Sequence, residues 1–239
     1  LLSRANQPTT SKPFMTAWLG SPQQLAELTD KIIPAPIALD TEFIRERTYF
    51  PQLALVQLSQ GDGEVLIDPL AVSQPGALAH VLQGHTLKLM HSPSEDLQAF
   101  RHGWGLLVEP IFDTQVAAAL CGLGAGIGYQ ALVEKLLGVH LEKGETRSDW
   151  LRRPLSDAQC HYAAEDVRYL HALHAELDAR LGALGRREWL AHDCARMIDA
   201  ARNEAPDPHP HLSMRSAQRL PADGQARVRR MLLWREQIA

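Results

Sequence analysis

Short apolar runs bounded by turn residues fill the first half of the chain and predict strands. The runs lie at Ile37–Asp40, with a longer alternative that ends at Phe43, and at Leu53–Ser59, Glu64–Asp68 and Thr86–Met90. Gly61-Asp62-Gly63 separates the second run from the third and predicts a hairpin turn. We therefore expect most of one sheet to form before residue 91.

The second half of the chain follows the helical period. In the first half, a short helix is expected to begin at Ser21-Pro22 and another to span 76–82. In the second half, helices are expected at 129–137, 156–181 and 186–203. The glycine-rich stretch 122–128 follows a helix, so it predicts a turn between helices and not a dinucleotide-binding loop. Strands with interleaved and following helices predict an α/β fold, a mixed sheet flanked by helices.

The composition near the two ends suggests a division into segments. Residues 1–15 are expected to be disordered or vector-derived, and residues 16–203 are expected to form one folded domain. The stretch NEAPDPHPHLSMRS contains three prolines and predicts a linker over residues 204–223. Residues 224–239 are expected to begin a further helical domain.

Composition excludes several classes of protein. With 239 residues, 45% of them hydrophobic and 22% charged, the chain can bury one substantial core. It has no apolar stretch near the roughly 20 residues that span a bilayer, and its start lacks a secretory apolar core, so we expect a cytoplasmic protein. Three widely spaced cysteines without a CxxC pattern argue against a disulfide framework and a thiolate zinc site.

The charge is unevenly distributed. Residues 1–185 carry 14 Lys or Arg against 21 Asp or Glu, whereas residues 186–239 carry 10 against 7. A catalytic module rich in carboxylates, followed by a mildly basic helical tail, produces this division. Chance placement of charges on solvated helix faces produces it equally well.

The first strand ends in a pair of acids. Asp40 and Glu42 point to one face of the strand, and Thr41 points to the other. Two neighbouring carboxylates repel each other unless a cation lies between them or the strand end is solvated. Taken alone, the solvated strand end is the more common explanation.

A second acid follows the strand that ends at Met90. Ser92, Pro93 and Glu95 predict a helix start with Ser92 as the N-cap and Glu95 in a capping box. Asp96 then lies in the first turn of the helix, near the end of the strand. A carboxylate that only favours the positive end of a helix dipole is the alternative.

A third acid lies on the helix that Ser156 and Gln159 begin with a second capping box. At about 100° per residue, Asp166 falls within the leucine stripe of that helix, and Tyr162 lies one turn earlier on the same side. Glu165 points away from the stripe. A buried salt bridge is the alternative explanation for Asp166.

Together these residues form a candidate metal-binding set. Four carboxylates with a tyrosine hydroxyl offer hard oxygen ligands for two divalent cations, Mg²⁺ or Mn²⁺: Asp40, Glu42, Asp96 and Asp166, with Tyr162. Two such ions favour in-line phosphoryl displacement. The sequence therefore indicates hydrolysis of phosphodiester bonds.

Three motifs carry a resemblance to a known family. LDTEF with RERTYFPQLALVQLS, then MHSPSEDLQAF, then DWLRRPLSDAQCHYAAEDVRYL resemble the exonuclease motifs of ribonuclease D, in the DEDD superfamily of 3'-5' exonucleases. The spacing of Tyr162 and Asp166 is similar to that of the tyrosine branch. The resemblance implies a ribonuclease H-like exonuclease fold over residues 16–203. It also implies that residues 224–239 begin a nucleic-acid-binding (HRDC-like) helical domain.

The resemblance also implies roles for single residues. Asp40 would be shared by both cations, Glu42 and Asp166 would complete the site of one, and Asp96 would serve the other. Tyr162 would orient the attacking water. Contacts to the terminal nucleotide would come from Thr41 and Phe43 and, with a packed loop histidine as the alternative, from His91. Asp113 is expected to cap a helix or to support the site without binding metal.

The function that the resemblance implies is a 3'-5' exoribonuclease that releases nucleoside 5'-monophosphates from RNA 3' ends, for example in tRNA processing. The expected partner is RNA with a free 3' end, and neither a membrane nor a protein partner is implied. A DNA-directed exonuclease of the same superfamily is the first alternative. A catalytically silent RNA-binding scaffold is the second, and the complete set of acids argues against it.

Overall fold

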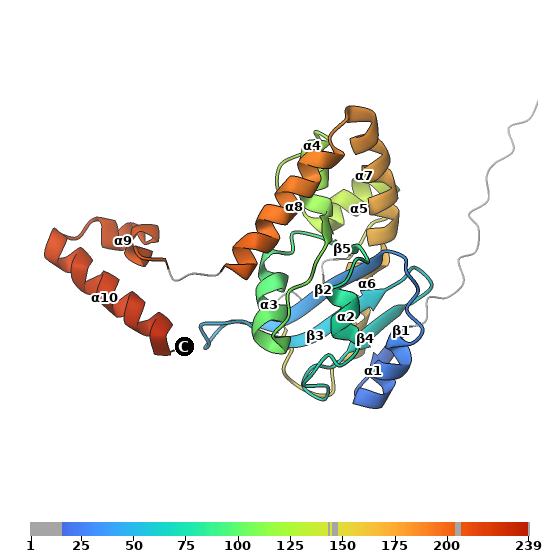
Figure 1. The fold of residues 1–239 in the computed structure, drawn as a ribbon, viewed down its shortest axis with the longest axis horizontal. Helices are drawn as coiled ribbons and strands as arrows, with labels where there is room; N and C mark the ends of the chain where they lie inside the picture. Colours follow the sequence, from blue (N-terminus) through green and yellow to red (C-terminus); the bar gives the residue numbers. More distant parts are fainter. Residues whose placement is uncertain (1–15, 143, 145–147, 204–206, 239) are drawn as a thin grey trace, which may run out of the picture.

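The computed structural model describes residues 16–142, 144, 148–203 and 207–238, and its centre is a six-stranded sheet (Figure 1). The strand order is β1-β4-β3-β2-β5-β6. β2, β3 and β4 pair antiparallel, while β1 with β4, β2 with β5 and β5 with β6 pair parallel, so the sheet is mixed as predicted. The strands are β1 Thr16–Leu19, β2 Ile37–Ile44, β3 Gln52–Ser59, β4 Glu64–Ile67, β5 Lys88–Met90 and β6 Ile111–Asp113.

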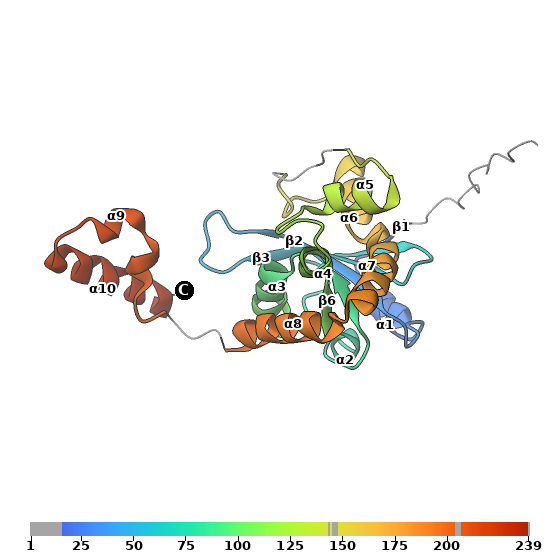
Figure 2. The ribbon, with the colours of Figure 1, turned by 90° about the horizontal axis from the view of Figure 1, so that it is seen from above.

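Helices cover both faces of this sheet (Figure 2). α5 and α6 lie on one face, and α1, α2, α3 and α8 lie on the other. The helices of this domain are α1 Pro22–Thr29, α2 Leu78–Leu82, α3 Ser94–Trp104, α4 Thr114–Leu120, α5 Tyr129–Leu137, α6 Asp157–Arg168, α7 Leu170–Leu184 and α8 Arg187–Arg202. None of the helices in the described part of the chain is long and apolar enough to cross a membrane.

The predicted strands and most predicted helices are confirmed. β2 extends to Ile44, one residue beyond the longer of the two alternatives. Asp113 caps α4 through its side chain, and Ser156 and Gln159 form the predicted capping box of α6. The leucine stripe is buried on α7, because its side chains pack with buried hydrophobic residues of the sheet and of the neighbouring helices in one large core, the main core.

Two predictions about local structure were wrong, and two short strands were not predicted. β1 and β6 were missed, since four and three residues are too few to show a strand pattern. The expected helix 156–181 is two helices that meet at Tyr169. Ser92 does not cap α3: its φ of 56° is left-handed, and an N-cap residue normally takes the β region.

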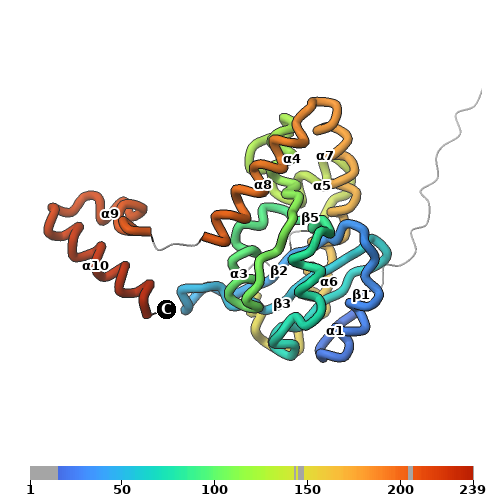
Figure 3. The backbone as a smooth tube through the Cα atoms, in the orientation of Figure 1, coloured from blue at the N-terminus to red at the C-terminus, as the bar shows by residue number. Residues whose placement is uncertain are grey.

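The range predicted as a linker contains short helices. η1 Pro210–Ser213 and α9 Arg215–Gln218 precede α10 Ala222–Ile238, which starts two residues before the predicted boundary. This C-terminal part stands beside the sheet domain (Figure 3). The Tyr49 hydroxyl donates a hydrogen bond to Glu236 at 2.6 Å, so the end of α10 lies against the β2–β3 connection. The predicted segment 1–15 lies outside the described residues.

A buried lysine ties β5 to the end of α2 and to the segment before β6. Lys88 is 0% exposed, and its ammonium group donates hydrogen bonds to the carbonyl oxygens of Gly84 at 3.0 Å, Val81 at 3.4 Å and Glu109. Burial lowers its pKa to about 8, against the opposing effect of the Glu109 carboxylate. The amine therefore loses its proton more readily in the folded chain than in the unfolded one.

This difference predicts a pH dependence of stability. From about pH 8 to pH 10.5 the unfolded chain binds more protons at Lys88 than the folded chain, so the contribution of Lys88 to the free energy of unfolding should rise with pH. The full rise is about 3 kcal/mol. Urea unfolding of the wild type and of Lys88→Met across this range measures it, because other titrating groups cancel in the difference. A difference that stays constant with pH would contradict the assignment.

Candidate metal centre

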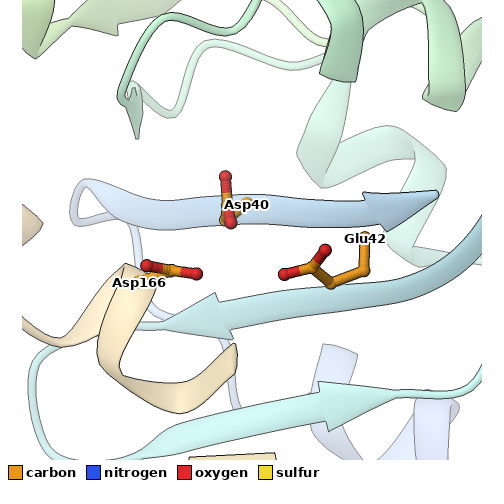
Figure 4. Close-up of side chains that lie close together, drawn as sticks. All are labelled: Asp40, Glu42 and Asp166. Atoms are coloured by element: carbon orange, nitrogen blue, oxygen red, sulfur yellow. The ribbon is translucent and has the colours of Figure 1, made fainter. Parts of the chain in front are cut away.

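Three carboxylates meet between β2 and α6 (Figure 4). Asp40 and Glu42 project from β2, Asp166 projects from the last turn of α6, and one ligand oxygen from each lies within 4.8 Å of the others. Strand alternation places the first two on one face of the sheet. The capping box at Ser156 sets where α6 begins, and α6 packs across β2, β3 and β4, which brings Asp166 over that face.

The electrostatics of this cluster favour a bound cation. Burial, followed by the Asp96, Asp166 and Glu42 carboxylates, raises the pKa of Asp40 well above its usual value. Burial and the neighbouring Asp166 and Asp96 raise the pKa of Glu42 to about 9, and burial is also the main cause that raises the pKa of Asp166 to about 7. Without a cation the cluster therefore tends to hold protons, and a divalent ion would displace them.

Tyr162 lies one turn before Asp166 and is half-buried beside the cluster. Burial, and then the carboxylates of Asp166, Glu42 and Asp40, raise the pKa of Tyr162 well above its ordinary value. The phenol consequently stays protonated and can donate a hydrogen bond at neutral pH. The backbone of Gly144 covers its ring so closely that a Cβ at position 144 would lie 1.7 Å from Tyr162 Cδ2, so only glycine fits there.

The fourth predicted ligand, Asp96, lies outside the three-carboxylate cluster. It is 7% exposed on α3, and its carboxylate accepts a hydrogen bond from the Thr41 hydroxyl. Thr41 points to the face opposite Asp40 and Glu42, as alternation predicts. Burial raises the pKa of Asp96 to about 6, and the hydrogen bond from Thr41 opposes this rise. Thr41 thus holds Asp96 beneath the strand that carries Asp40.

A buried glutamine next to Asp40 was not predicted. Gln57 on β3 pairs in register with Asp40, so their side chains share one face of the sheet. Gln57 is 0% exposed, and both polar atoms of its carboxamide lack a hydrogen-bond partner among the residues that the structure describes. An unpaired buried amide beside a carboxylate cluster is the kind of group that supports a metal ligand or its water. The donor set and this amide together fit a divalent cation.

The other predicted contact residues have different surroundings. His91 Nδ1 lies 2.8 Å from Thr114 Oγ1, and its ring packs edge-on against Tyr129. Burial lowers the pKa of His91 to about 4. Its contacts are those expected of a packed loop histidine, which is the alternative to a contact with the nucleotide. Phe43 is half-buried and packs against the main core at the end of β2.

Comparisons with known proteins agree with this geometry. Residues 17–182 match a family described as 3'-5' exonuclease. The chain is 50% identical over 223 residues to a ribonuclease D of Xanthomonas oryzae, which covers 93% of this chain and 61% of that protein. The chain therefore spans less than two thirds of the length of that relative.

Solved structures show the same fold. The crystal structure of Escherichia coli RNase D, described as an exoribonuclease involved in structured RNA processing, matches with a TM-score of 0.82 and 36% identity, over 95% of this chain and 60% of that one. Brucella melitensis NrnC with bound Mg²⁺ matches with a TM-score of 0.66 and 28% identity, over 79% of this chain and 90% of that one.

Proposed function

Because the chain belongs to the ribonuclease D family of 3'-5' exonucleases, we propose that it is an exoribonuclease that removes nucleoside 5'-monophosphates from RNA 3' ends. The observation that carries the proposal is the cluster of Asp40, Glu42 and Asp166, whose ligand oxygens lie within 4.8 Å of one another. Carboxylates held this close can bind divalent cations that promote hydrolysis of a phosphodiester, whereas a surface that only binds RNA does not need them.

Each carboxylate has a role in this proposal. Asp40, Glu42 and Asp166 would hold divalent cations, Mg²⁺ or Mn²⁺, and Asp96, set by Thr41, would extend the acidic site. The cations would supply electrostatic stabilisation for the attacking and leaving oxygens of an in-line displacement. Gln57, whose amide has no hydrogen-bond partner among the described residues, would hold a water molecule of the cation.

Tyr162 would position the attacking water. Its protonated hydroxyl lies beside Asp166, and the close approach of Gly144 restricts its ring. A donor at this position can fix the water in line with the scissile bond.

The substrate would be RNA with a free 3' hydroxyl. Thr41 and Phe43 lie along β2 next to the acids, and an aromatic ring there can stack on the terminal base. His91, which packs at the end of β5, would contribute a further contact. Structured RNAs such as tRNA precursors are the proposed class, because the E. coli relative processes structured RNA.

The role of Tyr162 gives a specific prediction. Replacing Tyr162 by Phe should lower kcat about 10²-fold, because the water loses its donor, while the affinity for Mn²⁺ stays within a factor of about two. Single-turnover assays measure the first quantity, and titration of Mn²⁺ followed by electron paramagnetic resonance measures the second. Equal losses of both would count against a water-orienting role.

A direct test of the function compares matched single-stranded RNA and DNA, each with a free or a blocked 3' end, in Mg²⁺ and in EDTA. We expect RNA with a free 3' end to shorten stepwise in Mg²⁺ and the other arms to stay intact or react slowly. Faster digestion of DNA would make the chain a DNA-directed exonuclease. No digestion in any arm would reject the catalytic proposal.

A further inference from the structure

The junction between α6 and α7 lies directly after one of the clustered carboxylates. α6 ends at Arg168, α7 begins at Leu170, and Tyr169 lies between them. Asp166 is therefore in the last turn of α6. In one continuous helix the carbonyl of Glu165 would accept a hydrogen bond from the N–H of Tyr169, four residues later.

A tyrosine from another helix occupies this position. The hydroxyl of Tyr129, the first residue of α5, donates a hydrogen bond to the carbonyl oxygen of Glu165 at 2.8 Å. The same hydroxyl accepts a hydrogen bond from the N–H of Tyr169 at 3.2 Å. It thus stands between the two backbone groups that a continuous helix would join directly.

The ring of Tyr129 is itself held in place. It packs edge-on against His91, with ring centroids 5.7 Å apart. His91 Nδ1 lies 2.8 Å from the Thr114 hydroxyl, and that hydroxyl donates to the Met90 carbonyl at 3.1 Å. A chain of contacts therefore connects the end of β5 to the end of α6 through one phenol.

We propose that Tyr129 is a positioning residue: its hydroxyl interrupts the helical hydrogen bonding between Glu165 and Tyr169 and so fixes the direction in which Asp166 projects. The proposal rests on the proposed function only in taking Asp166 as a ligand of a divalent cation. A side chain inserted into a helical ladder bends or ends the helix at that point. Asp166 follows Glu165 directly, so the bend determines where its carboxylate lies relative to Asp40 and Glu42.

Loss of the hydroxyl has a definite structural consequence. Without it, the Glu165 carbonyl and the Tyr169 N–H are free to bond each other, which would extend α6 towards α7 and rotate its last turn. The alternative, two unpaired polar groups, is costly where the surroundings are buried. Either result moves Asp166, and a displacement of about 1 Å at a catalytic group is enough to impair a reaction.

The experiment uses Tyr129→Phe in the full chain, with Tyr169→Phe as the matched control. Both variants lose one tyrosine hydroxyl at the same junction, but only the first loses the bridge between Glu165 and Tyr169. In Tyr129→Phe we expect the affinity for Mn²⁺, measured by electron paramagnetic resonance, to fall about 10-fold or more. We expect kcat at saturating Mn²⁺ to fall, KM for RNA to stay within about twofold, and circular dichroism to show a folded chain.

A crystal structure of Tyr129→Phe gives a second readout, in which we expect the Asp166 carboxylate to be displaced from those of Asp40 and Glu42. An unchanged Mn²⁺ affinity in Tyr129→Phe would overturn the proposal, and so would an equal loss in Tyr169→Phe. If the wild type binds Mn²⁺ but digests no nucleic acid, the proposed function fails, while the comparison of Mn²⁺ affinities still decides the role of Tyr129.

Discussion

Replacing Asp40 by Asn is expected to slow Mg²⁺-dependent shortening of RNA by at least about 10³-fold, which corresponds to about 4 kcal/mol of transition-state stabilisation. Asn keeps the shape of the side chain but removes its negative charge. Asp40 is the acid whose pKa is raised by all three of Asp96, Asp166 and Glu42, so it lies at the electrostatic centre of the site. Removal of its charge should weaken cation binding more than any other single change at the site.

The same substitution should leave the fold intact or make it more stable. In the absence of metal, burial and three neighbouring carboxylates disfavour a charged Asp40, and a neutral amide removes that repulsion. Loss of activity together with a thermal midpoint equal to or above that of the wild type is therefore the expected result. Such an exchange of stability for function is common at active sites.

Initial rates on a 5'-labelled RNA, with thermal unfolding in EDTA, measure both quantities. Asp62→Asn is the matched control, since it makes the same chemical change at an exposed turn between β3 and β4. The control should keep wild-type activity. If Asp40→Asn retains more than about a tenth of the wild-type rate, Asp40 is not a ligand that the reaction requires.

Local sequence rules were sufficient for the part of the site that depends on a single element. Alternation along β2 placed Asp40 and Glu42 on one face, and the structure confirms this with Asp166 beside them. The capping box at Ser156 fixed the start of α6, although the leucine stripe against which Asp166 was placed lies on the separate helix α7. In each case the signal lies within a few neighbouring residues.

Contacts between distant segments account for what was missed. Ser92 takes a left-handed conformation while its N–H donates to Asp113 at 3.0 Å, 21 residues away, so the helix begins later than its local pattern predicts. Gln57 lies in an apolar run, and only the register of β2 with β3 reveals it as a neighbour of Asp40. The break at Tyr169 depends on the Tyr129 hydroxyl of α5. The helical periodicity of residues 156–181 carries no information about that contact.

The second large effect concerns stability and comes from an ion pair at the end of α6. Arg168 Nε lies 2.7 Å from Glu64 Oε1 on β4, and the two side chains are 13% and 1% exposed. The Thr16 hydroxyl also donates to Glu64, at 3.4 Å. The pair therefore joins the helix that carries Asp166 to β4 and lies close to the β1 edge strand.

Arg168→Met should lower the free energy of unfolding by about 3 to 5 kcal/mol, because it leaves the Glu64 carboxylate buried without its cation. That is a large part of the roughly 5 to 15 kcal/mol that stabilises a typical domain. Urea unfolding measures the loss, and the double variant Glu64→Gln with Arg168→Met should recover part of it, since no buried charge remains. A loss below about 1 kcal/mol, the usual range of exposed pairs, would contradict the assignment. A double variant less stable than Arg168→Met alone would show that packing of the arginine stem, and not the unpaired carboxylate, dominates.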